Sequence, residues 1–128
     1  MNYVADTHSL VWYFTEDPRL SKKALDVFEQ TKQKDLIIIP TVVLAELMFI
    51  SQKGKITITF SETLKKIEES ENFNVAPLDI EILKVADKME ADIEMHDKLI
   101  AATALHFEAA LITKDEEIKK LGIVSTVW

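Results

Sequence analysis

The chain has 128 residues, of which 48% are hydrophobic and 29% are charged, and this balance excludes a disordered or membrane-embedded protein. Its formal net charge of −7 repels a phosphate backbone at long range, which argues against a simple nucleic-acid-binding module. The same charge argues less against an enzyme that binds a nucleic acid through divalent cations, because bound cations reverse the local charge. Cysteine is absent, so disulfides and thiolate metal sites are excluded and any metal must be held by oxygen or imidazole.

Neither a targeting segment nor a linker is visible in the sequence. The first residues lack a basic stretch followed by an apolar core, and no apolar run approaches the ~18 residues of a membrane span. We therefore expect a single domain over residues 1–128 that resides in the cytoplasm.

Five short apolar runs, each bounded by polar residues, predict strands. They are Tyr3–Ala5, 36–39, Phe73–Ala76, Ala110–Ile112 and 123–124. Runs that are apolar on both faces are typical of strands buried in a parallel sheet.

Segments with helical spacing separate these runs. Ser21 is a plausible N-cap for a helix that carries Ala24 and Phe28, and Asp79 can cap another. The remaining predicted helices begin near Ser9, run from Thr41 to about Gln52, surround Leu64 and Ile67, and cover residues 96–107. Strands alternating with helices imply right-handed crossovers and a three-layer α/β/α sandwich around a mostly parallel sheet.

Four of the 22 acidic residues interrupt apolar surroundings, where an unpaired carboxylate is costly. Asp6 and Asp115 each follow a predicted strand at its carboxyl end, where parallel sheets bind ligands. Glu46 stands inside an apolar helix, and Asp97 stands in the first turn of another. Each also has a purely structural explanation: a helix cap for the three aspartates and an ion pair for Glu46. Two strand ends and two adjacent helices can nevertheless bring all four carboxylates to one edge of the sheet.

Carboxylates gathered in this way repel one another, and some would stay protonated at neutral pH without a compensating cation. Mg²⁺ or Mn²⁺ supplies that charge and prefers oxygen ligands. One such ion, or two held roughly 3.5–4 Å apart, activates water for in-line attack on phosphorus. We therefore predict that Asp6, Glu46, Asp97 and Asp115 form a metal-dependent nuclease site, in which Glu46 orients the attacking water.

Four segments in a fixed order carry a family resemblance: DTHSLVW at 6–12, PTVVLAEL at 40–47, HDKLIAATA at 96–104 and LITKD at 111–115. This order resembles the PIN domain, and most closely the VapC-type toxins of prokaryotic toxin–antitoxin pairs. The resemblance covers essentially the whole chain. It implies a compact α/β/α fold, Mg²⁺- or Mn²⁺-dependent endoribonuclease activity on an RNA substrate, a homodimer and inhibition by a cognate antitoxin.

The resemblance also implies roles for individual residues. The family's acidic positions fall on Asp6, Glu46, Asp97 and Asp115, and three hydroxyls that orient a carboxylate or a water fall on Thr7, Ser9 and Thr113. Asp92 or Glu94 can also contribute an oxygen, because residues 90–97 are rich in acids. Trp12, Tyr13 and Phe14 cannot all face one core. They are either divided between core and surface or part of a groove for a dimer partner or an antitoxin helix.

Two other functions compete with the nuclease. A phosphohydrolase would use Asp6 as a nucleophile that forms an aspartyl-phosphate, but haloacid-dehalogenase-like enzymes place a second aspartate two residues later, where this chain has His8. A PIN-like scaffold that binds a partner without cutting RNA is the second alternative. Because all four acids are present, the sequence shows no sign of lost catalysis.

Overall fold

The computed structural model describes residues 1–30 and 36–128, in which strands and helices alternate along the chain. The strands are β1 (Tyr3–Ala5), β2 (Ile37–Pro40), β3 (Phe73–Ala76), β4 (Ala110–Ile112) and β5 (Thr126–Val127). The helices are α1 (Thr7–Phe14), α2 (Lys22–Gln30), α3 (Thr41–Gln52), α4 (Phe60–Glu69), α5 (Ile80–Lys88), α6 (Met95–His106) and α7 (Glu116–Leu121). This alternation matches the predicted α/β class.

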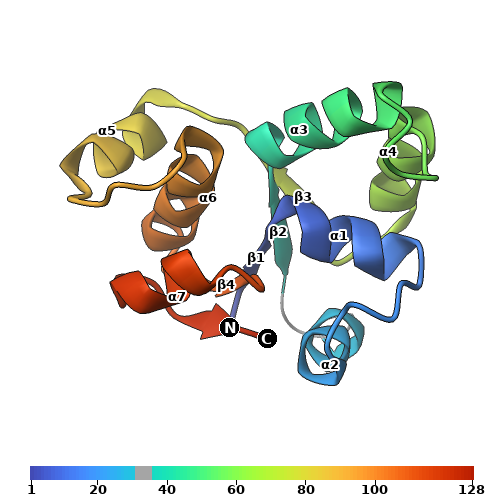
Figure 1. Cartoon of the computed structure of the whole chain (residues 1–128), viewed down its shortest axis with the longest axis horizontal. Helices are drawn as coiled ribbons and strands as arrows, with labels where there is room; N and C mark the ends of the chain where they lie inside the picture. Colours follow the sequence, from blue (N-terminus) through green and yellow to red (C-terminus); the bar gives the residue numbers. More distant parts are fainter. Residues whose placement is uncertain (31–35) are drawn as a thin grey trace.

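All described strand pairs are parallel, and the strand order is β3-β2-β1-β4-β5. The chain builds β2 and β3 outward from one side of β1 and then returns to add β4 and β5 on the other side. The order therefore reverses between β1 and β4, and such a switch point leaves a crevice outside the carboxyl ends of the strands. Figure 1 shows the sheet between two groups of helices, with α5, α6 and α7 on one side and α1 to α4 on the other.

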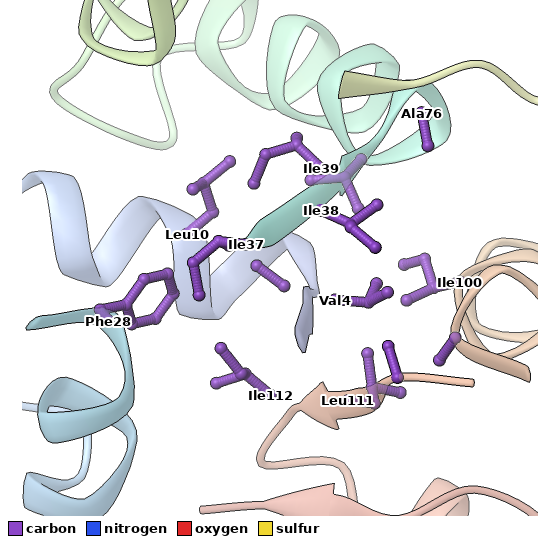
Figure 2. Close-up of a cluster of buried hydrophobic side chains, with 14 of the residues drawn as sticks. Val4, Leu10, Phe28, Ile37, Ile38, Ile39, Ala76, Ile100, Leu111 and Ile112 are labelled. Carbon is purple, nitrogen blue, oxygen red and sulfur yellow. The ribbon is translucent and has the colours of Figure 1, made fainter. Parts of the chain in front are cut away.

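The central strands are buried on both faces. Val4 and Leu111 lie on the face covered by α6, and Ile112 lies on the face covered by α1 and α2 (Figure 2). Fully burying one such aliphatic side chain stabilises the fold by about 1.5–3 kcal/mol. The sheet is thus a rigid base for the loops and helix starts at its carboxyl edge.

Helix α6 lies between the sheet and α5 because its inner surface is built from small side chains. Ala101 and Ala102 are fully buried and pack in a second hydrophobic cluster with Ile82 and Met89, while Ala104 and Ile100 belong to the main core. These alanines permit a close approach of the helix to the sheet. This packing determines how far the first turn of α6 lies from the sheet.

One predicted strand is wrong. Residues 123–124 form a bend, and the last strand pairs three residues later, at Thr126–Val127 opposite Leu111 and Ile112. Gly122, with φ of +65°, ends α7 in a left-handed conformation, so the chain needs the next residues to turn back to the sheet. The side chain of Val124 packs against both hydrophobic clusters from this bend, which explains its apolar character without a strand.

The other predicted elements are confirmed within one or two residues. Ser21 accepts a hydrogen bond from the backbone N–H of Ala24 (3.0 Å) ahead of α2, and the side chain of Asp79 accepts one from Ile82 ahead of α5. Among residues 1–30 and 36–128, no helix has the length and apolar character needed to cross a bilayer.

Candidate active site

Asp6 lies at the carboxyl end of β1, in the crevice at the switch point. Its Oδ1 accepts hydrogen bonds from the backbone N–H of Ser9 (2.9 Å) and from the Ser9 hydroxyl (2.5 Å), so it also caps α1. Burial raises the pKa of Asp6, although hydrogen bonds from Ser9 and Thr113 lower it in part. The capping explanation is therefore correct, but it leaves unexplained why a partly buried carboxylate lies beside other acids.

Glu46 lies in the middle of α3, which starts directly after β2 and contacts both α1 and α6. Its Oε1 accepts a hydrogen bond of 2.5 Å from the hydroxyl of Thr7, the first residue of α1. Within residues 1–30 and 36–128, no lysine or arginine forms an ion pair with this carboxylate. The ion-pair explanation of Glu46 therefore finds no support, and Thr7 orients its side chain instead.

Asp97 lies in the first turn of α6, but the residue that caps this helix is Glu94. The Glu94 carboxylate accepts hydrogen bonds from the backbone N–H groups of His96 (3.0 Å) and Asp97 (3.3 Å) and lies 2.7 Å from His96 Nδ1. Asp97 therefore does not provide the N-cap, although it does stand in the first turn, where the helix macrodipole favours a carboxylate.

The pKa of Asp97 is raised to about 6. The largest cause is desolvation by partial burial, followed by repulsion from neighbouring negative charges. These charges belong to Asp115, Glu94, Glu46 and Asp6. Five acids from four segments of the chain thus act on one another electrostatically.

Asp115 follows β4 and caps α7 by accepting hydrogen bonds from Glu117 N–H (2.8 Å) and Ile118 N–H (3.2 Å). The hydroxyl of Thr113 accepts a bond from the backbone N–H of Asp115 (3.1 Å). Since Thr113 also bonds to Asp6, this one buried threonine connects the acids at the ends of β1 and β4.

All four acids predicted from the sequence line one pocket of about 580 Å³. The fifth acid in its wall is Glu94, one of the two further candidates; Asp92, the other, is not part of this pocket. The remaining wall residues are Thr7, His8, Trp12, Arg19, Ile100 and Lys114. Segments separated by up to a hundred residues therefore converge at the carboxyl edge of the sheet, as the positions after β1 and β4 predicted.

The donors in this pocket suit a hard divalent cation, since they are carboxylate and hydroxyl oxygens that carry excess negative charge. In the described part of the chain, however, no three aspartate, glutamate or histidine side chains are spaced as ligands of one ion. Protein oxygens alone would therefore leave its coordination sphere incomplete. Mg²⁺ tolerates this arrangement well, because it usually keeps several waters and takes only one or two carboxylates.

Comparison with known proteins decides the family. Residues 3–124 match the model of the PIN domain. The chain belongs to the PIN domain family. No curated protein matches it in sequence, so the assignment rests on the family model and on the fold.

Solved structures share this PIN fold over nearly the whole chain. VapBC2 from Rickettsia felis, bound to a promoter DNA fragment, has a TM-score of 0.75 at 19% identity and covers 98% of this chain and 97% of that one. VapBC-1 from nontypeable Haemophilus influenzae has a TM-score of 0.68 at 21% identity, covering 98% and 96%. Mycobacterium tuberculosis VapC20, a sarcin-ricin loop cleaving toxin, has a TM-score of 0.69 at 13% identity, covering 97% of each chain. At these identities the likeness concerns the fold.

Sequence reasoning missed two cations at the edge of this PIN-domain site, Arg19 and Lys114. Both line the acidic pocket, and both lie over the ring of Trp12, at 4.9 Å and 5.8 Å from its centroid. The sequence gives little indication that these two cations line the site, because Lys114 stands between two other candidate residues and Arg19 lies in a loop. One clue is that Arg19 is the single arginine in the sequence.

The raised pKa of Asp97 predicts a stability effect. A carboxyl whose folded-state pKa lies above its ordinary value of 3.8 loses stability as pH rises from about 4 to about 6, because the unfolded state ionises first. Replacing Asp97 with Asn should therefore stabilise the metal-free protein at neutral pH by about 1 kcal/mol, a value reduced for solvent screening of this half-exposed group.

This gain corresponds to a rise of roughly 3–6 °C in Tm for a domain of this size. Calorimetry in EDTA should show the difference between Asp97→Asn and wild type at neutral pH and little difference near pH 4. An equal Tm for the two proteins at neutral pH would show that neither desolvation nor the neighbouring acids raise the pKa of Asp97.

Proposed function

We propose that this PIN domain is a Mg²⁺- or Mn²⁺-dependent endoribonuclease and the toxin of a type II toxin–antitoxin pair in the cytoplasm. The observation that carries the proposal is the convergence of Asp6, Glu46, Asp97 and Asp115 on one pocket at the switch point of the sheet. Structural neighbours from VapBC pairs, one of them a toxin that cleaves the sarcin-ricin loop, support the same conclusion.

Each side chain has a distinct task in this proposal. Asp6, Asp97 and Asp115 would hold the cation, one or two of them directly and the rest through its bound waters, with Glu46 beside it. When bound, the ion supplies positive charge for the phosphoryl oxygens and an activated water for in-line attack. Glu46, held by Thr7, orients that water, while Ser9 and Thr113 keep the Asp6 carboxylate in place.

Cleavage of RNA by the purified protein tests the activity directly. Single-stranded RNA should be cut internally with Mn²⁺ or Mg²⁺, remain intact in EDTA, and be cut again when the ion is restored. Induction in a bacterial host should stop growth, and Asp6→Asn should abolish the arrest. Intact RNA under all metal conditions would favour a PIN-like scaffold that binds a partner without catalysis.

The partners are part of the same proposal. Trp12, Tyr13 and Phe14 all line a second pocket of about 850 Å³, where they meet Leu25 of α2 and Phe73 of β3. This pocket is also lined by Glu16, Asp17, Glu29 and Glu69. A groove with apolar and acidic residues suits an amphipathic helix that carries both apolar and basic side chains, which we assign to the cognate antitoxin. We also expect a homodimer, which light scattering of the purified protein will test.

A further inference from the structure

The acidic pocket adjoins a smaller pocket of different charge. This annex has a volume of about 270 Å³, and it shares His8, Trp12 and Arg19 with the acidic pocket. Its other charged residues are Lys55 and Asp17, and Asp17 is already paired with Arg19. In a chain of net charge −7, a surface with a net positive charge beside a cluster of five acids needs an explanation.

Arg19 is held at the boundary between the two pockets. Its Nε and Nη2 donate to the two oxygens of Asp17 at 3.0 Å and 2.8 Å, and the backbone N–H of Asp17 bonds to the carbonyl of Trp12 (2.9 Å). The guanidinium also lies over the Trp12 ring. An arginine side chain that would otherwise sample many rotamers is thereby pre-oriented.

The two hydrogen bonds to Asp17 use only part of the Arg19 guanidinium. Of its five N–H groups, those on Nη1 and one on Nη2 have no acceptor within residues 1–30 and 36–128, and the side chain is 65% exposed. A planar pair of N–H donors in this arrangement matches two oxygens of a phosphate.

The annex has an apolar wall in addition to its charges. Ile50 and Ile56 come from the end of α3 and the loop after it, and Thr57 adds a hydroxyl. Lys55 is presented from the tight turn at Gly54, where φ is +71°, and its backbone N–H bonds to the carbonyl of Ile50 (3.1 Å). Apolar side chains that line one pocket together with two cations suit a nucleobase and its phosphate.

We infer that the annex binds the nucleotide of single-stranded RNA next to the scissile phosphate. Arg19 and Lys55 bind the phosphate of that nucleotide, and the base lies against the apolar wall. The inference rests on the proposed nuclease function and extends it, because it assigns a path for the RNA strand past the acidic pocket. The charges are complementary on both sides: the acids attract a cation, and the annex attracts an anion.

Salt dependence tests this assignment. Each phosphate contact with single-stranded nucleic acid contributes about −0.7 to the slope of log affinity against log salt concentration. Arg19→Gln and Lys55→Gln should therefore each make the slope of log kcat/KM against log[KCl] shallower by about 0.7, at constant Mn²⁺. Each should also lower kcat/KM for RNA roughly tenfold at low salt.

Two controls separate a phosphate contact from a general change of the protein. Lys88→Gln removes an exposed lysine at the end of α5, outside both pockets, and should keep the wild-type slope. Arg19→Lys keeps the charge but loses the fork, so it should keep the slope while still lowering kcat/KM.

The inference is wrong if Arg19→Gln and Lys55→Gln cut RNA with the wild-type slope. It is equally wrong if the two variants keep the wild-type slope but lose affinity for a partner protein, because the annex is then a protein-docking site. A wild-type protein that cuts no RNA in Mn²⁺ is a different result. It removes the proposed nuclease function first, and the nucleotide assignment with it.

Discussion

Asparagine at position 6 or at position 97 should reduce Mn²⁺-dependent RNA cleavage by roughly a hundredfold or more. The substitution is nearly isosteric but removes the negative charge that we assign to cation binding. Asparagine is also a good N-cap, so Asp6→Asn can still accept the bond from Ser9 and keep the start of α1. Initial rates on a labelled single-stranded RNA will measure the loss.

A matched control is Asp87→Asn, which neutralises an exposed aspartate on α5 outside the acidic pocket. It should cut RNA at the wild-type rate, and all three variants should keep the wild-type circular dichroism spectrum. Were Asp6→Asn and Asp97→Asn both to cleave as fast as wild type, the four-carboxylate assignment would be lost while the fold would stand.

Cation affinity should fall steeply below about pH 6, where Asp97 takes up a proton. A carboxylate must be ionised to bind Mg²⁺ or Mn²⁺, so protons compete with the metal. For one such group the affinity should drop about tenfold for each pH unit below its pKa. Burial also raises the pKa of Asp6, which adds to the dependence. Mn²⁺ titration calorimetry at several pH values will measure the effect.

The same titration of Asp97→Asn identifies the group responsible. This variant should bind Mn²⁺ more weakly at neutral pH and lose affinity less steeply between pH 7 and pH 5, because asparagine does not titrate. A wild-type affinity that stays constant from pH 7 to pH 5 would contradict the role of Asp97 as a cation ligand.

Most of the fold was predictable from local patterns. Tyr3–Ala5, Phe73–Ala76 and Ala110–Ile112 are short apolar runs whose ends are marked by polar residues. Helices α2, α4 and α5 have clear amphipathic periodicity, whereas α3 and α6 have little. The failure at residues 123–124 has a physical origin. An apolar residue such as Val124 packs equally well from a bend, and only the geometry after Gly122 determines where pairing with β4 begins.

The site was partly predictable for a related reason. Asp6 and Asp115 follow adjacent parallel strands, so their positions along the chain already place them at one edge of the sheet. Glu94 was only one of several acids in residues 90–97, where no periodic pattern distinguishes a cap from a surface charge. Arg19 was not predictable, because its position depends on a loop that returns to Trp12 through contacts with no sequence signature.

The hydroxyl of Ser9 has one hydrogen but two acceptors within reach. Its Oγ lies 2.5 Å from Asp6 Oδ1 and 3.0 Å from the carbonyl oxygen of Ile112 on the neighbouring strand. When the Asp6 carboxyl is ionised, it receives that hydrogen; when it is protonated, it can donate to Oγ, and the serine hydrogen turns to Ile112. The local structure therefore accommodates both charge states, so protonation of Asp6 does not separate β1 from β4.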